Sequence, residues 1–225
     1  MRASVIRRAQ RIMLGIVLLA SLAVGWSLWR ATEAEYGPPW LQPLLGPPQT
    51  LAGWRIGIVA GHSGNDSGAV CADGLTEVAV NEKVAEEVVR RLARRGATVD
   101  LLQEFDQRLG GYQADAFLSI HSDSCEYDLS GFKVATLEGG SAASDALVTC
   151  LWQQYEAVTG LKPHPDTITY DMRGYHAFRE IAPDTPAAII EIGFLQGDRD
   201  LLTHHPDLVA MGIVKGLECF LAKDE

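Results

Sequence analysis

The sequence predicts an α/β fold: a single domain in which a mixed, mostly parallel sheet is flanked by helices. Three observations predict it. Strand-like apolar runs recur along the chain, amphipathic helical segments lie between them, and strand, helix, strand and strand follow one another in this order. The chain has 225 residues, 47% of them hydrophobic, which is enough for one folded domain of ordinary size.

The expected strands are five short runs rich in aliphatic and aromatic residues. They cover residues 55–60, 98–103, 116–120, 132–137 and 187–192. A helix is predicted over residues 77–95, because apolar residues recur there every four positions and form one apolar face. These residues are Val80, Val84, Val88 and Leu92. Two more helices are expected over 142–158 and 207–221, and one more strand around 175–181.

The N-terminal segment predicts a membrane anchor. Four arginines among the first 11 residues precede an uncharged apolar run, residues 12–29, which would span about 27 Å as a helix. Since positively charged flanks stay inside, we expect a single-pass cell-membrane protein with a cytoplasmic N-terminus and an extracellular or periplasmic domain. A cleaved signal peptide is the alternative, because Thr32-Glu33-Ala34 offers a small-x-small site, and the protein would then be secreted.

Prolines mark the boundary of the folded part. Five of the ten prolines lie between residues 33 and 50, which predicts an extended spacer. The chain therefore divides into a cytoplasmic basic segment, an anchor or signal sequence, a Pro-rich linker and a folded domain. These parts are residues 1–11, 12–29, 30–50 and 51–225.

The charge of the folded part excludes one class of partner. Five of the 19 basic residues lie within the first 30 positions, where acidic residues are absent, so residues 31–225 carry 14 basic against 29 acidic residues. An acidic surface of this kind repels phosphate backbones, and we expect no nucleic-acid partner. We expect the protein to be a monomer.

Four polar residues occupy unusual places in the pattern. His62 and His121 directly follow apolar runs, Glu191 interrupts another, and Glu77 begins the first long helix. The carboxyl ends of parallel strands meet at the edge where open α/β sheets place their ligands. A single such histidine is more often a hydrogen-bonded core residue, but several on converging strand ends favour ligation. Two imidazoles and one carboxylate are a known ligand set for catalytic zinc, with a separate carboxylate as general base.

In these segments the sequence resembles the zinc-dependent N-acetylmuramoyl-L-alanine amidases of the type-3 fold, which cut the bacterial cell wall. The resemblance is carried by four blocks in the family's order: residues 61–69, 74–77 with Asn81, 119–124 and 190–195. It implies that His62, Glu77 and His121 bind Zn²⁺ and that Glu191 is the catalytic carboxylate. It also implies peptidoglycan as the substrate, cleaved between N-acetylmuramic acid and L-alanine.

The chain departs from the family pattern at two places. The family usually has an Asp two residues before the Gly-His pair, where this chain has Val59 and Ala60, and an Asn where this chain has Asp123. Neither position is a metal ligand, so the changes concern the surroundings of the site rather than the metal itself. Asp66 either orients His62 or shapes the Gly-rich turn in which it lies.

Four cysteines, at positions 71, 125, 150 and 219, are either buried thiols or two disulfides. If they pair, we expect Cys71 with Cys125 and Cys150 with Cys219, because each of the first two follows shortly after a candidate metal ligand.

Other candidate residues fit the site less well. His164 lies in a Pro-flanked loop, and His204 and His205 precede a helix start at Pro206, so we expect none of them to be a ligand. Three further residues could contact the substrate, although packing or surface roles are more common. They are Arg173, Tyr175 and Arg179.

Two other functions remain open at the level of sequence. One is a catalytically silent peptidoglycan-binding module that keeps the fold, although such a module has no need for a carboxylate within the apolar run at Glu191. The other is a zinc peptidase that cuts within the stem peptide, because the same metal chemistry cleaves any amide that fits the cleft.

Overall fold

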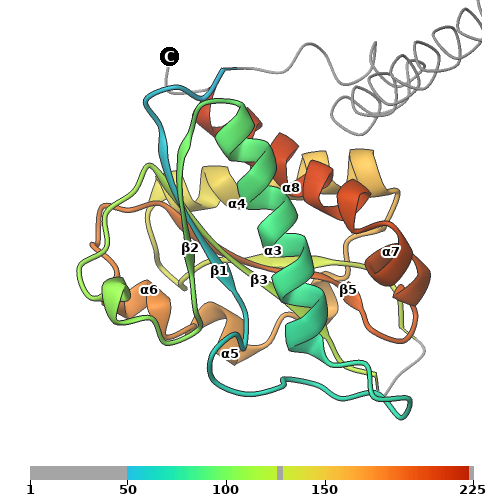
Figure 1. The fold of residues 1–225 in the computed structure, drawn as a ribbon. Helices are drawn as coiled ribbons and strands as arrows, with labels where there is room; N and C mark the ends of the chain where they lie inside the picture. The colour runs from blue at the N-terminus through green and yellow to red at the C-terminus, as the bar shows by residue number, and fades with distance from the viewer. Residues whose placement is uncertain (1–49, 126–128, 223–225) are drawn as a thin grey trace, which may run out of the picture. The chain divides into compact units, whose positions relative to one another are not determined.

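A five-stranded sheet runs through the folded part of the chain, of which this computed structural model describes residues 50–125 and 129–222. The strands lie in the order β2-β1-β3-β5-β4 (Figure 1). They are β1 (Arg55–Ala60), β2 (Thr98–Leu102), β3 (Ala116–Asp123), β4 (Lys133–Ala135) and β5 (Ala187–Phe194). Among these described strands, β4 alone pairs in antiparallel fashion. The prediction of a single α/β domain with a mixed, mostly parallel sheet is confirmed.

The expected membrane anchor, residues 12–29, lies outside the described residues, as does nearly all of the linker, residues 30–50. Within the described ranges, no helix combines the length and the apolar character needed to cross a bilayer.

Helix α3 (Glu77–Arg94) packs its apolar face against the sheet, as its four-residue period predicts. Val84, Val88 and Leu92 have no exposed surface. Thr76 caps the helix, because its hydroxyl accepts a hydrogen bond from Ala79 N at 3.4 Å. The cap fixes where the first turn begins, and that turn carries Glu77 to the carboxyl end of the strands.

Two long helices, α4 (Ala142–Thr159) and α8 (Pro206–Leu221), pack against each other and share one apolar core with α3 (Figure 1). Their close approach depends on Gly216, because a Cβ atom there would lie 2.9 Å from Leu151 Cα. Any larger residue at position 216 would therefore push the two helices apart.

Both disulfides of the expected pairing are present. Cys71 pairs with Cys125, which joins the segment before α3 to the segment after β3, and Cys150 pairs with Cys219, which joins α4 to α8. The structure describes no free cysteine. The first bridge, Cys71–Cys125, joins the two ends of the chain segment that contains Glu77 and His121, so it restrains the region of the candidate site.

Replacing both Cys150 and Cys219 by Ser should destabilise the domain by about 4 kcal/mol, because the bridge closes a loop of 69 residues in the unfolded chain. Urea unfolding of the variant and of the wild type, each followed by circular dichroism, measures the difference. An unchanged free energy of unfolding would show that the bridge does not restrain the unfolded chain.

Short helices cover the opposite face of the sheet: α5 (Tyr170–Arg173) and α6 (Ala177–Glu180) (Figure 1). The strand expected around residues 175–181 is therefore wrong. Tyr175, Phe178 and Ile181 are buried at a spacing of three, which is the period of a helical turn and not the alternation of a strand. The remaining described elements are η1 (Gln107–Leu109), η2 (Pro165–Thr167) and α7 (Arg199–His204).

Candidate functional site

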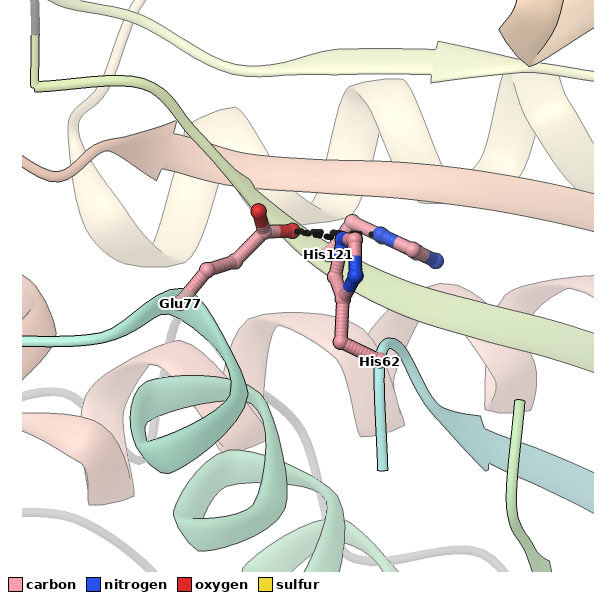
Figure 2. A group of neighbouring side chains, drawn as sticks. All are labelled: His62, Glu77 and His121. Atoms are coloured by element: carbon pink, nitrogen blue, oxygen red, sulfur yellow. Dashed lines mark hydrogen bonds and ion pairs between the residues drawn. The ribbon is translucent and has the colours of Figure 1, made fainter. Parts of the chain in front are cut away.

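Three side chains from three elements meet at the carboxyl end of the parallel strands (Figure 2). His62 follows β1, Glu77 is the first residue of α3, and His121 lies within β3. Glu77 Oε1 lies 3.2 Å from His62 Nε2 and 3.1 Å from His121 Nδ1. One nitrogen or oxygen atom from each of these residues lies within 4.8 Å of the other two. The structure thus brings the three predicted ligands together.

The backbone at His62 has a φ of 66°, a left-handed conformation that is uncommon for residues with a side chain. Hydrogen bonds hold this turn: Ser63 N donates to Ala60 O at 3.1 Å, and His62 N donates to Glu104 Oε2 at 2.8 Å. Unusual backbone conformations of this kind persist where the surroundings enforce them, often at functional sites. Here the turn places the imidazole beside Glu77.

Asp66 has both of the roles that the sequence suggests: it orients His62, and it shapes the Gly-rich turn. Its Oδ1 atom lies 2.6 Å from His62 Nδ1 and accepts a hydrogen bond from Gly68 N at 2.7 Å. These two bonds hold the pKa of Asp66 below its usual value. Gly68 has a φ of 60°, and a Cβ atom there would lie 2.6 Å from Glu77 Oε2. The Gly-rich turn therefore leaves room for the carboxylate of Glu77, a candidate ligand.

Several donors hold Glu77 in place. Ala69 N donates to Oε2 at 3.1 Å, while Ser122 N and Asn81 Nδ2 donate to Oε1 at 3.2 and 3.3 Å. Burial by itself would raise the pKa of Glu77, but hydrogen bonds with His121 and with His62 hold it well below its usual range. The carboxylate is therefore ionised and oriented toward both histidines.

The cluster fits a divalent metal ion. Two imidazole nitrogens and one carboxylate oxygen are a donor set that catalytic zinc sites use. Burial lowers the pKa of His121, but the neighbouring carboxylates of Glu104 and Glu77 outweigh it and raise the pKa to about 10. The imidazole of His121 therefore carries a second proton, whose positive charge neutralises these carboxylates. A bound metal cation would supply the same positive charge and would displace that proton.

Glu191 lies beside this cluster on the neighbouring strand. Its Cα pairs in register with that of His121, and on its other side with that of Lys133. The Oε2 atom of Glu191 is buried without a hydrogen-bond partner. Burial raises the pKa of this carboxyl to about 7, although the nearby His121 opposes the shift. A carboxyl of this kind can exchange a proton near neutral pH.

Asp123, where the family usually has Asn, forms an ion pair with the buried Lys133. The Lys133 ammonium also donates to Thr167 O at 3.2 Å. The departure from the family pattern thus has a structural role: the ion pair ties β3 and β4 to η2, the segment that leads into α5.

A cavity of about 360 Å³ opens beside His121 and Glu191, and α5 and the residues between α5 and α6 contribute to its wall. Tyr175 lines the cavity, and its hydroxyl accepts a hydrogen bond from Ser119 Oγ at 3.0 Å. Arg173 and Arg179 are exposed and do not belong to the lining. Of the three possible substrate contacts, the structure therefore places Tyr175 alone in the cavity wall.

Two residues of the site, Glu104 and His176, were not identified from the sequence. Glu104 lies within ion-pair distance of both His121 and His176, and all three line the cavity. A signal was present for Glu104, because it follows a predicted strand just as His62 does. His176 carries no such signal, because it lies inside the segment that the sequence predicts to be a strand, 175–181, and not at the end of one.

The other histidines considered lie outside the cluster. His164 Nδ1 lies 3.0 Å from Thr167 Oγ1, and His204 Nδ1 lies 3.1 Å from Asp200 Oδ1. Pro206 is the first residue of α8, with His205 at the N-cap position, as its place before a helix predicts.

The sequence matches a known protein family over most of the folded part. The family model described as N-acetylmuramoyl-L-alanine amidase matches residues 56–219. The chain is also 34% identical over 113 residues to the protein YqiI of Bacillus subtilis (strain 168), an alignment that covers 46% of this chain and 54% of that relative. The chain thus spans about half the length of this curated relative.

Solved amidase structures share the fold. An N-acetylmuramoyl-L-alanine amidase from Clostridium difficile 630 has a TM-score of 0.64 at 19% identity and covers 76% of this chain and 98% of its own. The CwlD amidase of Clostridioides difficile, solved in complex with the GerS lipoprotein, has a TM-score of 0.63 at 21% identity and covers 76% and 100%. AmiC2 of Nostoc punctiforme has a TM-score of 0.59 at 23% identity and covers 76% and 99%.

Proposed function

The chain belongs to the N-acetylmuramoyl-L-alanine amidase family, and from this premise we propose that it is a zinc-dependent hydrolase of peptidoglycan. The bond cleaved is the amide between N-acetylmuramic acid and L-alanine. His62, Glu77 and His121 hold the zinc ion, and Glu191 is the catalytic carboxylate. This proposal combines the family membership with the chemistry of the cluster and the cavity beside it.

One observation carries the proposal: Glu191, whose Oε2 atom is buried without a hydrogen-bond partner, lies in register with a residue of a His-Glu-His cluster. Leaving a buried carboxyl oxygen unpaired is costly, and a protein that only binds its ligand gains nothing from it. A hydrolase does gain, because a general base is most effective when its pKa lies near the working pH.

The residues of the chain divide the work of amide hydrolysis. Zinc, when bound, supplies Lewis acidity that lowers the pKa of a water molecule and polarises the amide carbonyl. Glu191 accepts a proton from the attacking water as the new carbon–oxygen bond forms. It then donates this proton to the amine of L-alanine as the carbon–nitrogen bond breaks. The cavity beside Tyr175 receives the substrate near these groups.

The N-terminal segment supports a location at the cell membrane. Residues 12–29 anchor the chain, residues 30–50 form a spacer, and residues 51–225 act outside the membrane as a monomeric catalytic domain. The apolar run with its preceding arginines supports this arrangement, and cleavage of the segment would make the protein secreted instead.

Purified peptidoglycan, incubated with the full chain and zinc, should release peptides that begin with alanine, with no new reducing sugar ends. N-terminal analysis of the released peptides and an assay of reducing ends measure the two products. Peptides with another N-terminus would indicate a peptidase acting within the stem peptide. No release, despite binding to the peptidoglycan, would indicate a silent binding module.

A further inference from the structure

Glu104 lies close to three groups of the site at once, and the residue is almost completely buried, with 6% exposure. Its Oε2 atom accepts a hydrogen bond from His62 N at 2.8 Å and lies 3.4 Å from His121 Nε2. Its Oε1 atom lies 3.0 Å from His176 Nε2. Glu104 lies two positions after the end of β2, so the chain that follows this strand contacts the cluster although β2 supplies no candidate metal ligand.

The two nitrogens of His121 face different carboxylates. Nδ1 lies 3.1 Å from Glu77 Oε1, on the side of the candidate metal ligands, whereas Nε2 faces Glu104. The Nε2 atom is buried and makes no hydrogen bond of good geometry. An imidazole that binds a metal through one nitrogen carries its proton on the other, and this proton needs an acceptor.

The partner of Glu104 on the cavity side fixes its orientation. His176 lies at the N-cap position of α6, its Nδ1 atom is 2.8 Å from Glu180 Oε1, and its ring stacks on Phe105 with the centroids 4.3 Å apart. With Oε1 held by His176, the Oε2 atom of Glu104 stays directed toward His121. The arrangement matches that of Asp66, which holds the nitrogen of His62 that faces away from Glu77.

We propose that Glu104 is a positioning residue that accepts the Nε2 proton of His121 and thereby presents Nδ1 of this histidine to the metal ion. This inference rests on the proposed zinc site. It assigns to Glu104 the function that Asp66 has toward His62, so each histidine ligand is oriented by its own carboxylate. A role limited to holding the segment after β2 would leave the metal affinity unaffected.

The test is the zinc affinity of the full chain, measured in detergent by competition with a chromophoric chelator. Glu104→Gln keeps the size of the side chain but removes its charge, and it should weaken zinc binding about 10- to 100-fold. Glu156→Gln is the matched control, because Glu156 pairs with Lys162 and belongs neither to the cluster nor to the cavity lining, and it should bind zinc within about twofold of the wild type. Wild-type affinity in Glu104→Gln would overturn the proposal.

A second readout separates orientation from folding. In the zinc-bound wild type, nitrogen-15 spectra of the His121 ring should show a protonated Nε2 and a metal-bound Nδ1, and zinc bound through Nε2 would overturn the assignment. If Glu104→Gln does not fold, Glu104→Asp replaces it in the test. The shorter side chain keeps the charge but moves it away from His121, so zinc binding should be weaker than in the wild type. Wild-type affinity in Glu104→Asp would again overturn the proposal. A folded wild type that binds no zinc would refute the zinc site itself.

Discussion

Replacing Glu191 by Gln should reduce peptidoglycan hydrolysis by at least about 100-fold and leave zinc binding unchanged, since general bases contribute about 10²- to 10⁴-fold. The amide has nearly the shape of the carboxyl but cannot accept the proton of the attacking water. It is also neutral, so it fits a pocket whose burial already raises the pKa of Glu191 to about 7. The fold should therefore tolerate the change.

Initial rates of alanine-terminated peptide release measure the effect, with zinc content determined by mass spectrometry on the same samples. Glu86→Gln, the same substitution on the exposed side of α3, is the control and should retain wild-type activity. An active Glu191→Gln protein would remove Glu191 from the mechanism. Loss of zinc together with activity would instead make Glu191 part of the metal site.

The second large effect is expected for His121→Ala, which should remove both the bound zinc and the activity. The substitution deletes a proposed ligand and leaves the ionised carboxylates of Glu77 and Glu104 without the imidazole that separates them. The loss of affinity should exceed the roughly 10- to 100-fold that is typical of residues that only support a ligand.

Zinc content after dialysis and the same peptide-release assay measure both losses. His204→Ala is the matched control, since this exposed histidine pairs with Asp200 outside the cluster and should be dispensable. If His121→Ala kept its zinc, the ion would have to be held by other residues, and the proposed ligand set would be wrong.

The sequence predicts a long helix more reliably than a short one, because the apolar repeat recurs several times in a long helix. The 18-residue helix α3 repeats its apolar face over several turns, so its bounds were predicted within one residue. The segment around Tyr175 and Phe178 holds a single turn of helix, too short for a period to be distinguished from a strand. The misread segment forms part of the cavity wall.

Two of the predicted ligands, His62 and His121, lie close together because strand ends converge, a consequence of topology that a sequence pattern can reveal. Glu104 and His176 could not be assigned in the same way. Their contact joins residues 72 positions apart and depends on how α6 packs over the sheet. Asp123 was recognised as a departure from the family, but its partner Lys133 became apparent only through the pairing of β4 with β5.

The register of the sheet sets the spacing of the chemical groups. His121, Glu191 and Lys133 occupy one row across β3, β5 and β4, each joined to the next by paired Cα positions. The distance from the proposed ligand His121 to the proposed base Glu191 is thus defined by backbone hydrogen bonds and not by a loop. Insertions between these strands leave that distance unchanged, whereas a slip of one residue in β5 would turn Glu191 to the opposite face. The region between the strands can therefore diversify for new substrates while the reactive centre keeps its dimensions.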